Sequence, residues 1–227
     1  VARQVVCQET GLDARIMEVR VDTASGARSG MTTASRATSL VGNALIDACA
    51  ALKRDLRERP LAELAGKTYE GRWRCDWTTT PEAGDRTVTH YSYGYAAQLV
   101  VLDEKGGIAS VLAAHDAGKI VNPTLFEGQI QGAVVMGLGY ALSEDLPLRA
   151  GLPASYRLAD LGLLKAHEVP PIEVIGVEVA DEFGPYGAKG VGEIGLVPTA
   201  AAVANALCRF DGRRRYQLPL KRREKRK

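Results

Sequence analysis

The chain has 227 residues, of which 46% are hydrophobic and 25% are charged. These fractions are close to those of globular proteins, so the chain can bury a core, and no apolar run approaches the ~20 residues of a membrane-spanning helix. The formal net charge of +2 comes from a basic tail at residues 221–227, without which acidic residues outnumber basic ones. We expect this tail to be disordered and solvated, and we expect neither a nucleic acid nor a membrane as partner.

Four cysteines are scattered along the chain without a CxxC pair: Cys7, Cys49, Cys75 and Cys208. This spacing argues against zinc and iron–sulfur ligation within the chain. Unpaired thiols are typical of a reducing compartment, so we expect a cytoplasmic location. If electrons leave a redox site here, the clusters that accept them must lie on a partner chain.

Helical and strand-like patterns alternate along the sequence. The longest helical pattern covers 33–57, where apolar residues recur at helical spacing until Pro60 ends it. Residues 103–107 separate two strand-like runs and are typical of a hairpin turn. The patterns predict helices over 1–9, 33–57, 122–144 and 196–207, and strands over 16–21, 69–77, 91–102, 108–115 and 172–179.

These elements predict an α+β fold with mixed sheets covered by helices. We expect two lobes within residues 1–220, with a boundary near 60–90. A stretch rich in proline and glycine, 146–171, is expected to be a surface loop. The helix predicted at 122–144 contains four glycines, Gly128, Gly132, Gly137 and Gly139. Each costs about 1 kcal/mol of helix propensity relative to alanine, which indicates close packing or close approach of a ligand.

The loop at 183–195 sets one acid, Glu193, among glycines and ahead of an alanine-rich helix. Glycines let a backbone pass close to a ligand, and a helix N-terminus suits an anionic group. Glu193 is therefore a candidate general base beside a phosphate-bearing cofactor. An alternative stays open, because glutamate is also favoured in the first turn of a helix.

Gly190, Gly192 and Gly195 also spell GxGxxG, the pattern of dinucleotide-binding loops. That pattern requires a strand directly before the glycines and an acidic residue about 20 positions later, within a βαβ unit. Here a long loop precedes the glycines, and the residues after the helix leave no room for such a unit. The dinucleotide-binding interpretation is therefore disfavoured.

Three further segments carry a family resemblance. Two of them, 115–123 and 127–140, follow one another, and the third spans 22–44. In chain order, the segments at 22–44, 115–123 and 127–140 and the loop at 189–193 resemble the molybdenum-binding subunit of the xanthine dehydrogenase/aldehyde oxidase family. The resemblance is greatest to its bacterial, selenium-dependent-like xanthine dehydrogenase branch. Family subunits are several times longer, so residues 1–220 resemble the C-terminal portion of the molybdopterin-binding domain.

The resemblance implies a cofactor and a reaction. The cofactor would be molybdenum held by molybdopterin, possibly in its cytosine dinucleotide form, with no side-chain ligand to the metal. Glu193 would act as general base while a water-derived oxygen is added to an electron-poor carbon of a small-molecule substrate, a purine such as xanthine or an aldehyde. Electrons would leave to iron–sulfur clusters and FAD on partner subunits, and the N-terminal half of the molybdenum subunit would be a further partner.

The resemblance also assigns cofactor-binding residues. Gln129 matches a glutamine whose amide binds the pterin, and Lys189 would neutralise a phosphate or position Glu193. The complete set is Thr32, Thr33, Ala34, Ser35, Arg36, Gly128, Gln129, Lys189, Gly190, Val191 and Gly192. Asp116 and Asn122 match family residues that we interpret as turn-makers.

Simpler interpretations of these residues stay open. Gln129 and Lys189 can be ordinary solvated side chains, and 32–36 can be an ordinary Ser/Thr helix cap. At the level of the whole chain, the alternative to a hydroxylase is a non-catalytic remnant or assembly module with the same fold.

Overall fold

The computed structural model describes residues 1–22, 24, 26, 30–79, 84, 87–90 and 92–220. The chain forms two compact units. Unit 1 comprises 1–94, 116–123 and 178–190, and unit 2 comprises 95–115, 124–177 and 191–227. The predicted lobe boundary near 60–90 stays a prediction, and the predicted tail at 221–227 lies outside the described residues.

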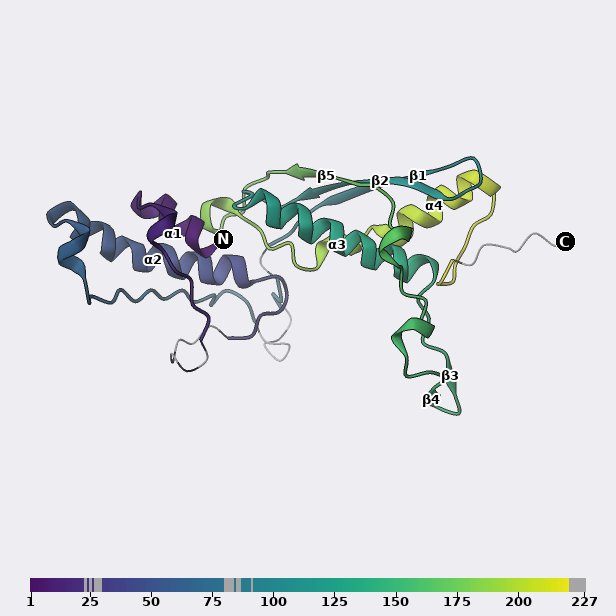
Figure 1. Cartoon of the computed structure of the whole chain (residues 1–227), viewed down its shortest axis with the longest axis horizontal. Coiled ribbons are helices and arrows are strands. Elements are labelled where there is room, and N and C mark those ends of the chain that lie inside the picture. The colour runs from purple at the N-terminus through teal and green to yellow at the C-terminus, as the bar shows by residue number, and fades with distance from the viewer. Residues whose placement is uncertain are drawn as a thin grey trace. The chain divides into compact units, whose positions relative to one another are not determined.

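Unit 1 is built on two helices, α1 (Ala2–Thr10) and α2 (Ala37–Glu58). They pack against each other (Figure 1) and bury Val5 and Cys49. Helix α1 ends at Gly11, whose φ of 73° is the left-handed conformation that closes many helices. Two single-turn 3₁₀ helices, η1 (Ala14–Ile16) and η2 (Leu61–Leu64), follow α1 and α2 in the chain.

Two predicted strands of unit 1 are wrong. Residues 17–22 that are described carry no strand, and 69–77 is an extended segment that contacts α2 instead of another strand. Its Tyr69 hydroxyl donates to Asp55 Oδ2 at 2.7 Å, and its Arg72 backbone N–H donates to Asp47 Oδ2 at 2.8 Å. Alternation of apolar residues arises here from packing on a helix, which the pattern alone cannot distinguish from a sheet.

Unit 2 contains a three-stranded sheet in the order β1 (Ala96–Leu102), β2 (Ile108–Asp116) and β5 (Ile172–Val177). Strands β1 and β2 are antiparallel, and Gln98 lies opposite Ala113. The predicted hairpin turn is confirmed, with Asp103 Oδ1 accepting the Gly107 N–H at 2.7 Å. The strand predicted from 91 begins at Ala96, and Tyr91 itself lies outside the described residues.

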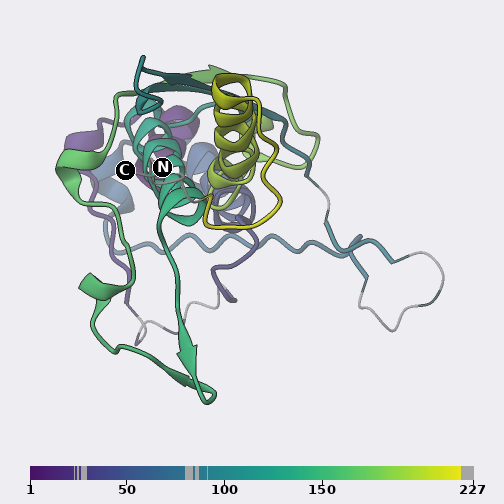
Figure 2. The same ribbon diagram turned by 90° about the vertical axis from the view of Figure 1, so that its right-hand side faces the viewer.

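Helices α3 (Pro123–Leu142) and α4 (Thr199–Asp211) cover one face of this sheet (Figures 1 and 2). The core between them is apolar. Its buried residues include Val100, Val111, Ala113, Ile130, Val134, Leu138, Val203 and Leu207. This arrangement confirms the predicted α+β fold with a sheet covered by helices.

The glycines of α3 divide into two pairs. At Gly137 a Cβ atom would lie 2.6 Å from the Thr199 Cβ, and at Gly139 it would overlap the Glu144 side chain. At Gly128 and Gly132 a Cβ atom would meet nothing within 4 Å. Close packing therefore explains Gly137 and Gly139, whereas Gly128 and Gly132 leave open space beside the helix.

The remaining elements are short. The predicted surface loop at 146–171 contains a small hairpin, β3 (Leu148–Arg149) with β4 (Leu152–Pro153), and two 3₁₀ turns, η3 (Leu158–Asp160) and η4 (Ala166–Glu168). Two more 3₁₀ turns, η5 (Pro185–Gly187) and η6 (Ile194–Leu196), lie in the glycine-rich loop. None of the helices in the described ranges is long and apolar enough to cross a membrane.

Candidate functional site

In unit 1, the segment after β2 is paired with the glycine-rich loop through its backbone. Gly118 and Ala188 form an antiparallel bridge, and the Lys189 N–H donates to the Ala117 carbonyl at 2.8 Å. Gly118 has a φ of 55°, and a Cβ atom at this position would overlap the Gly187 carbonyl. Only glycine therefore fits at position 118. The bridge joins the motif at 115–123 to the glycine-rich loop, which the sequence showed only as separate motifs.

Lys189 and Asp116 form a buried ion pair in unit 1. The Lys189 Nζ lies 2.6 Å from Asp116 Oδ2, with side chains that are only 8% and 3% exposed. Asp116 Oδ1 also accepts the N–H groups of Gly118 and Val179 at 3.0 and 3.3 Å. Burial alone would raise the pKa of the Asp116 carboxyl, but these hydrogen bonds and the Lys189 charge outweigh burial and lower it.

This pair changes the interpretation of both residues. The interpretation of Lys189 as an ordinary solvated side chain is wrong, because its ammonium group is buried against Asp116. Asp116 does make the predicted turn, through the Gly118 N–H. Its ionic role was missed, since the two residues lie 73 positions apart and neither local sequence carries a signal for the other.

The predicted cofactor turn at 32–36 is strained. Ala34 and Ser35 have φ values of 51° and 53°, in the left-handed region that non-glycine residues rarely adopt. The Arg36 guanidinium donates two hydrogen bonds to the Met31 carbonyl, at 3.0 and 2.8 Å, and so ties the ends of the turn together. Residues in such conformations cost about 1–3 kcal/mol each and cluster at functional sites.

Helix capping does not explain this turn. Helix α2 begins at Ala37, and its N-cap residue is Arg36, which makes no side-chain capping hydrogen bond. The interpretation of 32–36 as an ordinary Ser/Thr cap is therefore wrong. The turn instead packs on the glycine-rich loop, because a Cβ atom at Gly190 would overlap the Ser35 carbonyl. Unit 1 thus brings Ser35, Lys189 and Gly190 together.

In unit 2, Gln129 and the loop residue Gly192 are in direct contact. Gln129 is exposed on α3, and its Nε2 donates to the Gly192 carbonyl at 3.0 Å. Gly128 precedes it on the open side of the helix. The Gln129 side chain thus faces solvent, as the simpler interpretation allows, and its amide also ties α3 to the residue next to Glu193.

Glu193 is exposed and occupies the N-cap position of η6, without a side-chain capping hydrogen bond. Helix α4 begins only at Thr199. The alternative in which Glu193 simply occupies the first turn of the long helix is therefore wrong. Of the predicted residues, Thr32–Arg36, Lys189 and Gly190 belong to unit 1, and Gly128, Gln129 and Val191–Glu193 belong to unit 2.

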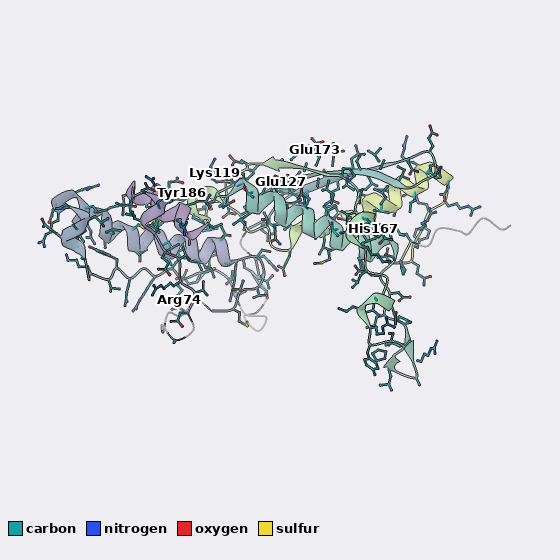
Figure 3. The ribbon with its side chains drawn as sticks, in the orientation of Figure 1. Arg74, Lys119, Glu127, His167, Glu173 and Tyr186 are labelled. Atoms are coloured by element: carbon teal, nitrogen blue, oxygen red, sulfur yellow. The ribbon has the colours of Figure 1, made fainter. Side chains whose placement is uncertain are left out.

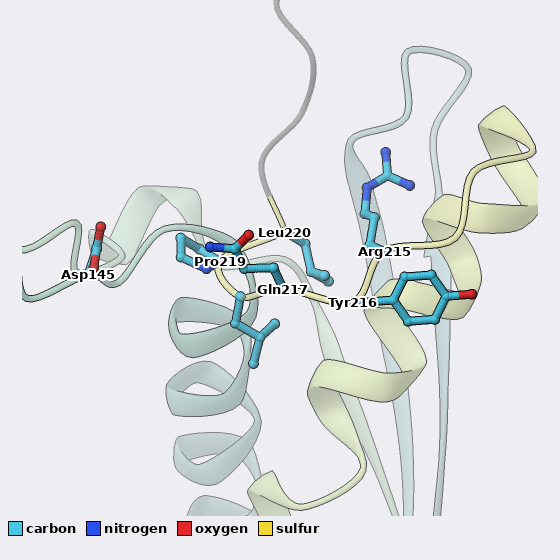
Figure 4. Close-up of a pocket in the computed structure, with 7 residues that line it drawn as sticks. Asp145, Arg215, Tyr216, Gln217, Pro219 and Leu220 are labelled. Carbon is cyan, nitrogen blue, oxygen red and sulfur yellow. The ribbon is translucent and has the colours of Figure 1, made fainter.

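Unit 2 contains a pocket at the C-terminal end of its described residues (Figure 4). It is lined by Asp145 and by 215–220, and Arg215 in its wall is paired with Asp211 at 2.6 Å. None of the predicted site residues lines it. Over the part of the chain that the structure describes, there is also no group of three or more His, Cys, Asp or Glu side chains that could hold a metal ion.

Comparison with known proteins identifies relatives for nearly the whole chain. Residues 58–170 match the family described as the molybdopterin cofactor-binding domain. A probable xanthine dehydrogenase subunit from Bacillus subtilis is 30% identical over 256 aligned residues, which cover 97% of this chain and 34% of that protein. An aldehyde oxidoreductase of Megalodesulfovibrio gigas is 29% identical over 217 residues, covering 87% of this chain and 23% of that protein.

Solved structures give the same result. The aldehyde oxidoreductase from Desulfovibrio gigas superimposes with a TM-score of 0.78 at 26% identity, over 96% of this chain and 26% of that one. The corresponding enzyme from Desulfovibrio desulfuricans gives a TM-score of 0.75 at 25% identity, over 94% of this chain and 25% of that one. The chain spans about a third or less of the length of the relatives it matches.

Proposed function

Because this chain belongs to the xanthine dehydrogenase/aldehyde oxidase family of molybdenum-binding oxidoreductase subunits, we propose that it is the C-terminal part of a molybdenum hydroxylase subunit. The reaction would add a water-derived oxygen to an electron-poor carbon of an N-heterocycle, such as a purine, or of an aldehyde. The observation that carries this proposal is the hydrogen bond from Gln129 Nε2 to the Gly192 carbonyl. It supports a role for the Gln129 amide beside the loop that bears Glu193.

The residues of each unit suit a molybdopterin. In unit 2, Gly128 leaves open space on α3 next to Gln129. The Gln129 Oε1 atom accepts no hydrogen bond from any described residue, so it can accept one from a pterin N–H. In unit 1, the strained turn carries the exposed residues Thr32 and Thr33, whose hydroxyl groups are able to donate and accept hydrogen bonds. We assign the eleven predicted cofactor-binding residues to this group on that basis.

Lys189 takes an indirect part in this assignment. Its ammonium is paired with Asp116, so a phosphate would have to compete with a buried carboxylate for it. We therefore assign Lys189 the task of holding the 187–190 backbone against 117–119, with Gly190 placed against the strained turn. The contribution of Gly190 is the absence of a side chain at that contact.

The chemistry divides between the cofactor and the chain. When bound, the molybdenum cofactor would supply the two-electron oxidation of the substrate and pass the electrons to acceptors on partner subunits. Glu193 would supply the base, with a carboxylate oxygen taking a proton during the reaction. Glu193 is exposed, and its place between Gly192 and η6 fixes the backbone that carries it.

Metal and pterin analysis tests this function. We expect the chain, co-expressed with the remaining part of a molybdenum subunit, to purify with about one molybdenum and one pterin per complex. Absence of both under these conditions would favour the alternative, a non-catalytic remnant or assembly module with this fold.

The N-terminal half and the iron–sulfur and FAD subunits are the partners that we propose. The four cysteines are free thiols, which supports a cytoplasmic location.

Replacing Gly128 by alanine should separate fold stability from cofactor binding. A methyl group there meets nothing within 4 Å, so helix propensity predicts a gain of about 0.5–1 kcal/mol in the free energy of unfolding. The same methyl would occupy the open space assigned to the cofactor, so molybdenum content should fall. Denaturant unfolding and metal analysis measure the two effects.

Gly132→Ala is the matched control, one turn away and equally open. It should give the same gain in stability with less effect on molybdenum content. An equal molybdenum content in the wild type and the Gly128→Ala variant would remove Gly128 from the cofactor site.

A further inference from the structure

A polar pair lies on the buried face of the unit 2 sheet. Gln98 on β1 faces Ala113 on β2, so the side chain of His115, two residues further on, is its diagonal neighbour on the same face. The other buried positions on this face are apolar, including Val100 and Val111. His115 is fully buried, although no step of the proposed reaction uses it.

Hydrogen bonds fix the orientation of the Gln98 amide. Its Oε1 accepts from the Thr199 hydroxyl at 2.8 Å, and its Nε2 donates to the Gly195 carbonyl at 2.7 Å. A flipped amide would set two carbonyl oxygens against each other at Gly195. The Nε2 atom therefore carries the donors, and it also lies 3.1 Å from His115 Nε2.

This orientation determines the state of His115. Because Gln98 Nε2 donates, His115 Nε2 must accept, so the ring is neutral and its proton is on Nδ1. Burial lowers the pKa of His115, in agreement with a neutral ring. The Nδ1 atom has no hydrogen-bond partner among the described residues, so Gln98 is what orients this ring.

The same amide joins the sheet to the segment that follows Glu193. Gly195 belongs to η6, two residues after Glu193, and Thr199 is the first residue of α4. Helix α3 supports the segment from the other side, because a Cβ atom at Gly195 would lie 2.5 Å from the Ala133 Cβ. The residues after Glu193 are thus held between a helix and a strand, through side chains anchored in regular structure.

We propose that Gln98 is a positioning residue, whose amide, oriented by the Thr199 hydroxyl, fixes η6 and with it the backbone of Glu193. Catalytic groups need to be held close to their productive geometry, and a group on a loop acquires that precision from contacts to rigid elements. Only the final consequence, an effect on turnover, rests on the proposed function. The fixing of η6 is a property of unit 2 alone.

Amide hydrogen exchange tests the fixing directly in the assembled protein. Gln98→Leu removes all three hydrogen bonds while keeping a side chain of similar size, so exchange at 191–196 should become at least about tenfold faster. Val100→Ala is the control, since Val100 lies on the same face of the same strand and contacts core residues instead of Gly195. It should lower overall stability without selective acceleration at 191–196. Equal exchange in the Gln98→Leu and wild-type proteins would overturn the proposal.

A second variant covers the case in which Gln98→Leu fails to fold. Thr199→Val keeps the shape of the side chain and removes the donor that orients the Gln98 amide. The chain has three histidines, so the protonation of each ring nitrogen can be resolved by nitrogen NMR. We expect His115 to be protonated at Nδ1 in the wild type, and exchange at 191–196 to be faster in Thr199→Val than in the wild type. A wild-type ring protonated at Nε2 would overturn the proposal.

Turnover then separates this inference from the proposed function. Gln98→Leu should lower kcat by about tenfold to a hundredfold with KM and molybdenum content retained, whereas Val100→Ala should not. Faster exchange and unchanged kcat in Gln98→Leu would overturn the positioning role. If the wild-type assembly holds no molybdenum, the proposed function fails, while the exchange and tautomer results still decide whether Gln98 fixes η6.

Discussion

Glu193→Gln is expected to lower turnover by about 10²–10⁴-fold, because the amide cannot take up a proton where the carboxylate can. Molybdenum and pterin content should be unchanged. The side chain is exposed and keeps its size, so the substitution leaves the Gln129–Gly192 hydrogen bond and η6 in place. Steady-state kinetics with candidate purines and aldehydes, alongside metal analysis of the same preparation, measure both quantities.

Glu173→Gln is the matched control for this experiment. Glu173 is another exposed glutamate of unit 2, on β5 (Figure 3), and it has no place in the proposed site. Its substitution should leave kcat and KM at wild-type values. Retained turnover in Glu193→Gln would refute the base assignment, and loss of turnover together with loss of molybdenum would show a structural effect instead.

Breaking the buried ion pair should have the largest effect on stability. Lys189→Met leaves the Asp116 carboxylate buried without its counterion, and Asp116→Asn does the same to the Lys189 ammonium. Such a loss typically lowers the free energy of unfolding by about 3–5 kcal/mol. The double variant Asp116→Asn with Lys189→Met should recover part of that loss, because no unpaired charge then remains. Denaturant unfolding of the four proteins gives the free energies.

The exposed pair between Lys119 and Glu178 provides the control. Its side chains are 54% and 43% exposed, and solvent-exposed pairs contribute about 0–1 kcal/mol. Lys119→Met (Lys119 is labelled in Figure 3) should therefore cost less than about 1 kcal/mol. Equal losses for Lys119→Met and Lys189→Met would contradict the structural role assigned to the buried pair.

The buried pair also predicts a dependence of stability on pH. The pKa of Asp116 is lowered in the folded state, so the folded protein holds the Asp116 proton less readily than the unfolded chain. The stabilisation is present above the unfolded pKa, about 3.9, and is lost as the pH falls through the lower folded pKa. Asp116→Asn should remove this acid-dependent part of the unfolding curve.

Much of the fold followed from local sequence. The hairpin at 103–107 carries its own turn chemistry, and the apolar periodicity of α2 and α3 extends over several turns. The start of α2 was placed four residues too early, because the strained conformations of Ala34 and Ser35 depend on packing against Gly190. Periodicity cannot report a conformation that a distant segment imposes.

The site was predicted less completely. Glycines marked the loop around Glu193, but the groups that hold it are far away in sequence: Gln98 contacts residues 97 and 101 positions later. The sequence singled out Lys189 but not its partner Asp116, since burial of a charge becomes visible only in three dimensions. Single-sequence reasoning identifies residues with unusual chemistry more readily than the contacts that orient them.

The burial of Lys189 also makes it a reporter of motion. An amine-directed reagent can reach its nitrogen only when unit 1 opens and the contact with Asp116 breaks, whereas the nitrogen of Lys119 is already accessible. When opening and closing are fast compared with modification, the ratio of the two labelling rates gives the free energy of that local opening. The labelling rate of Lys189 therefore measures how often the glycine-rich loop separates from the segment at 116–119, to which a single bridge joins it.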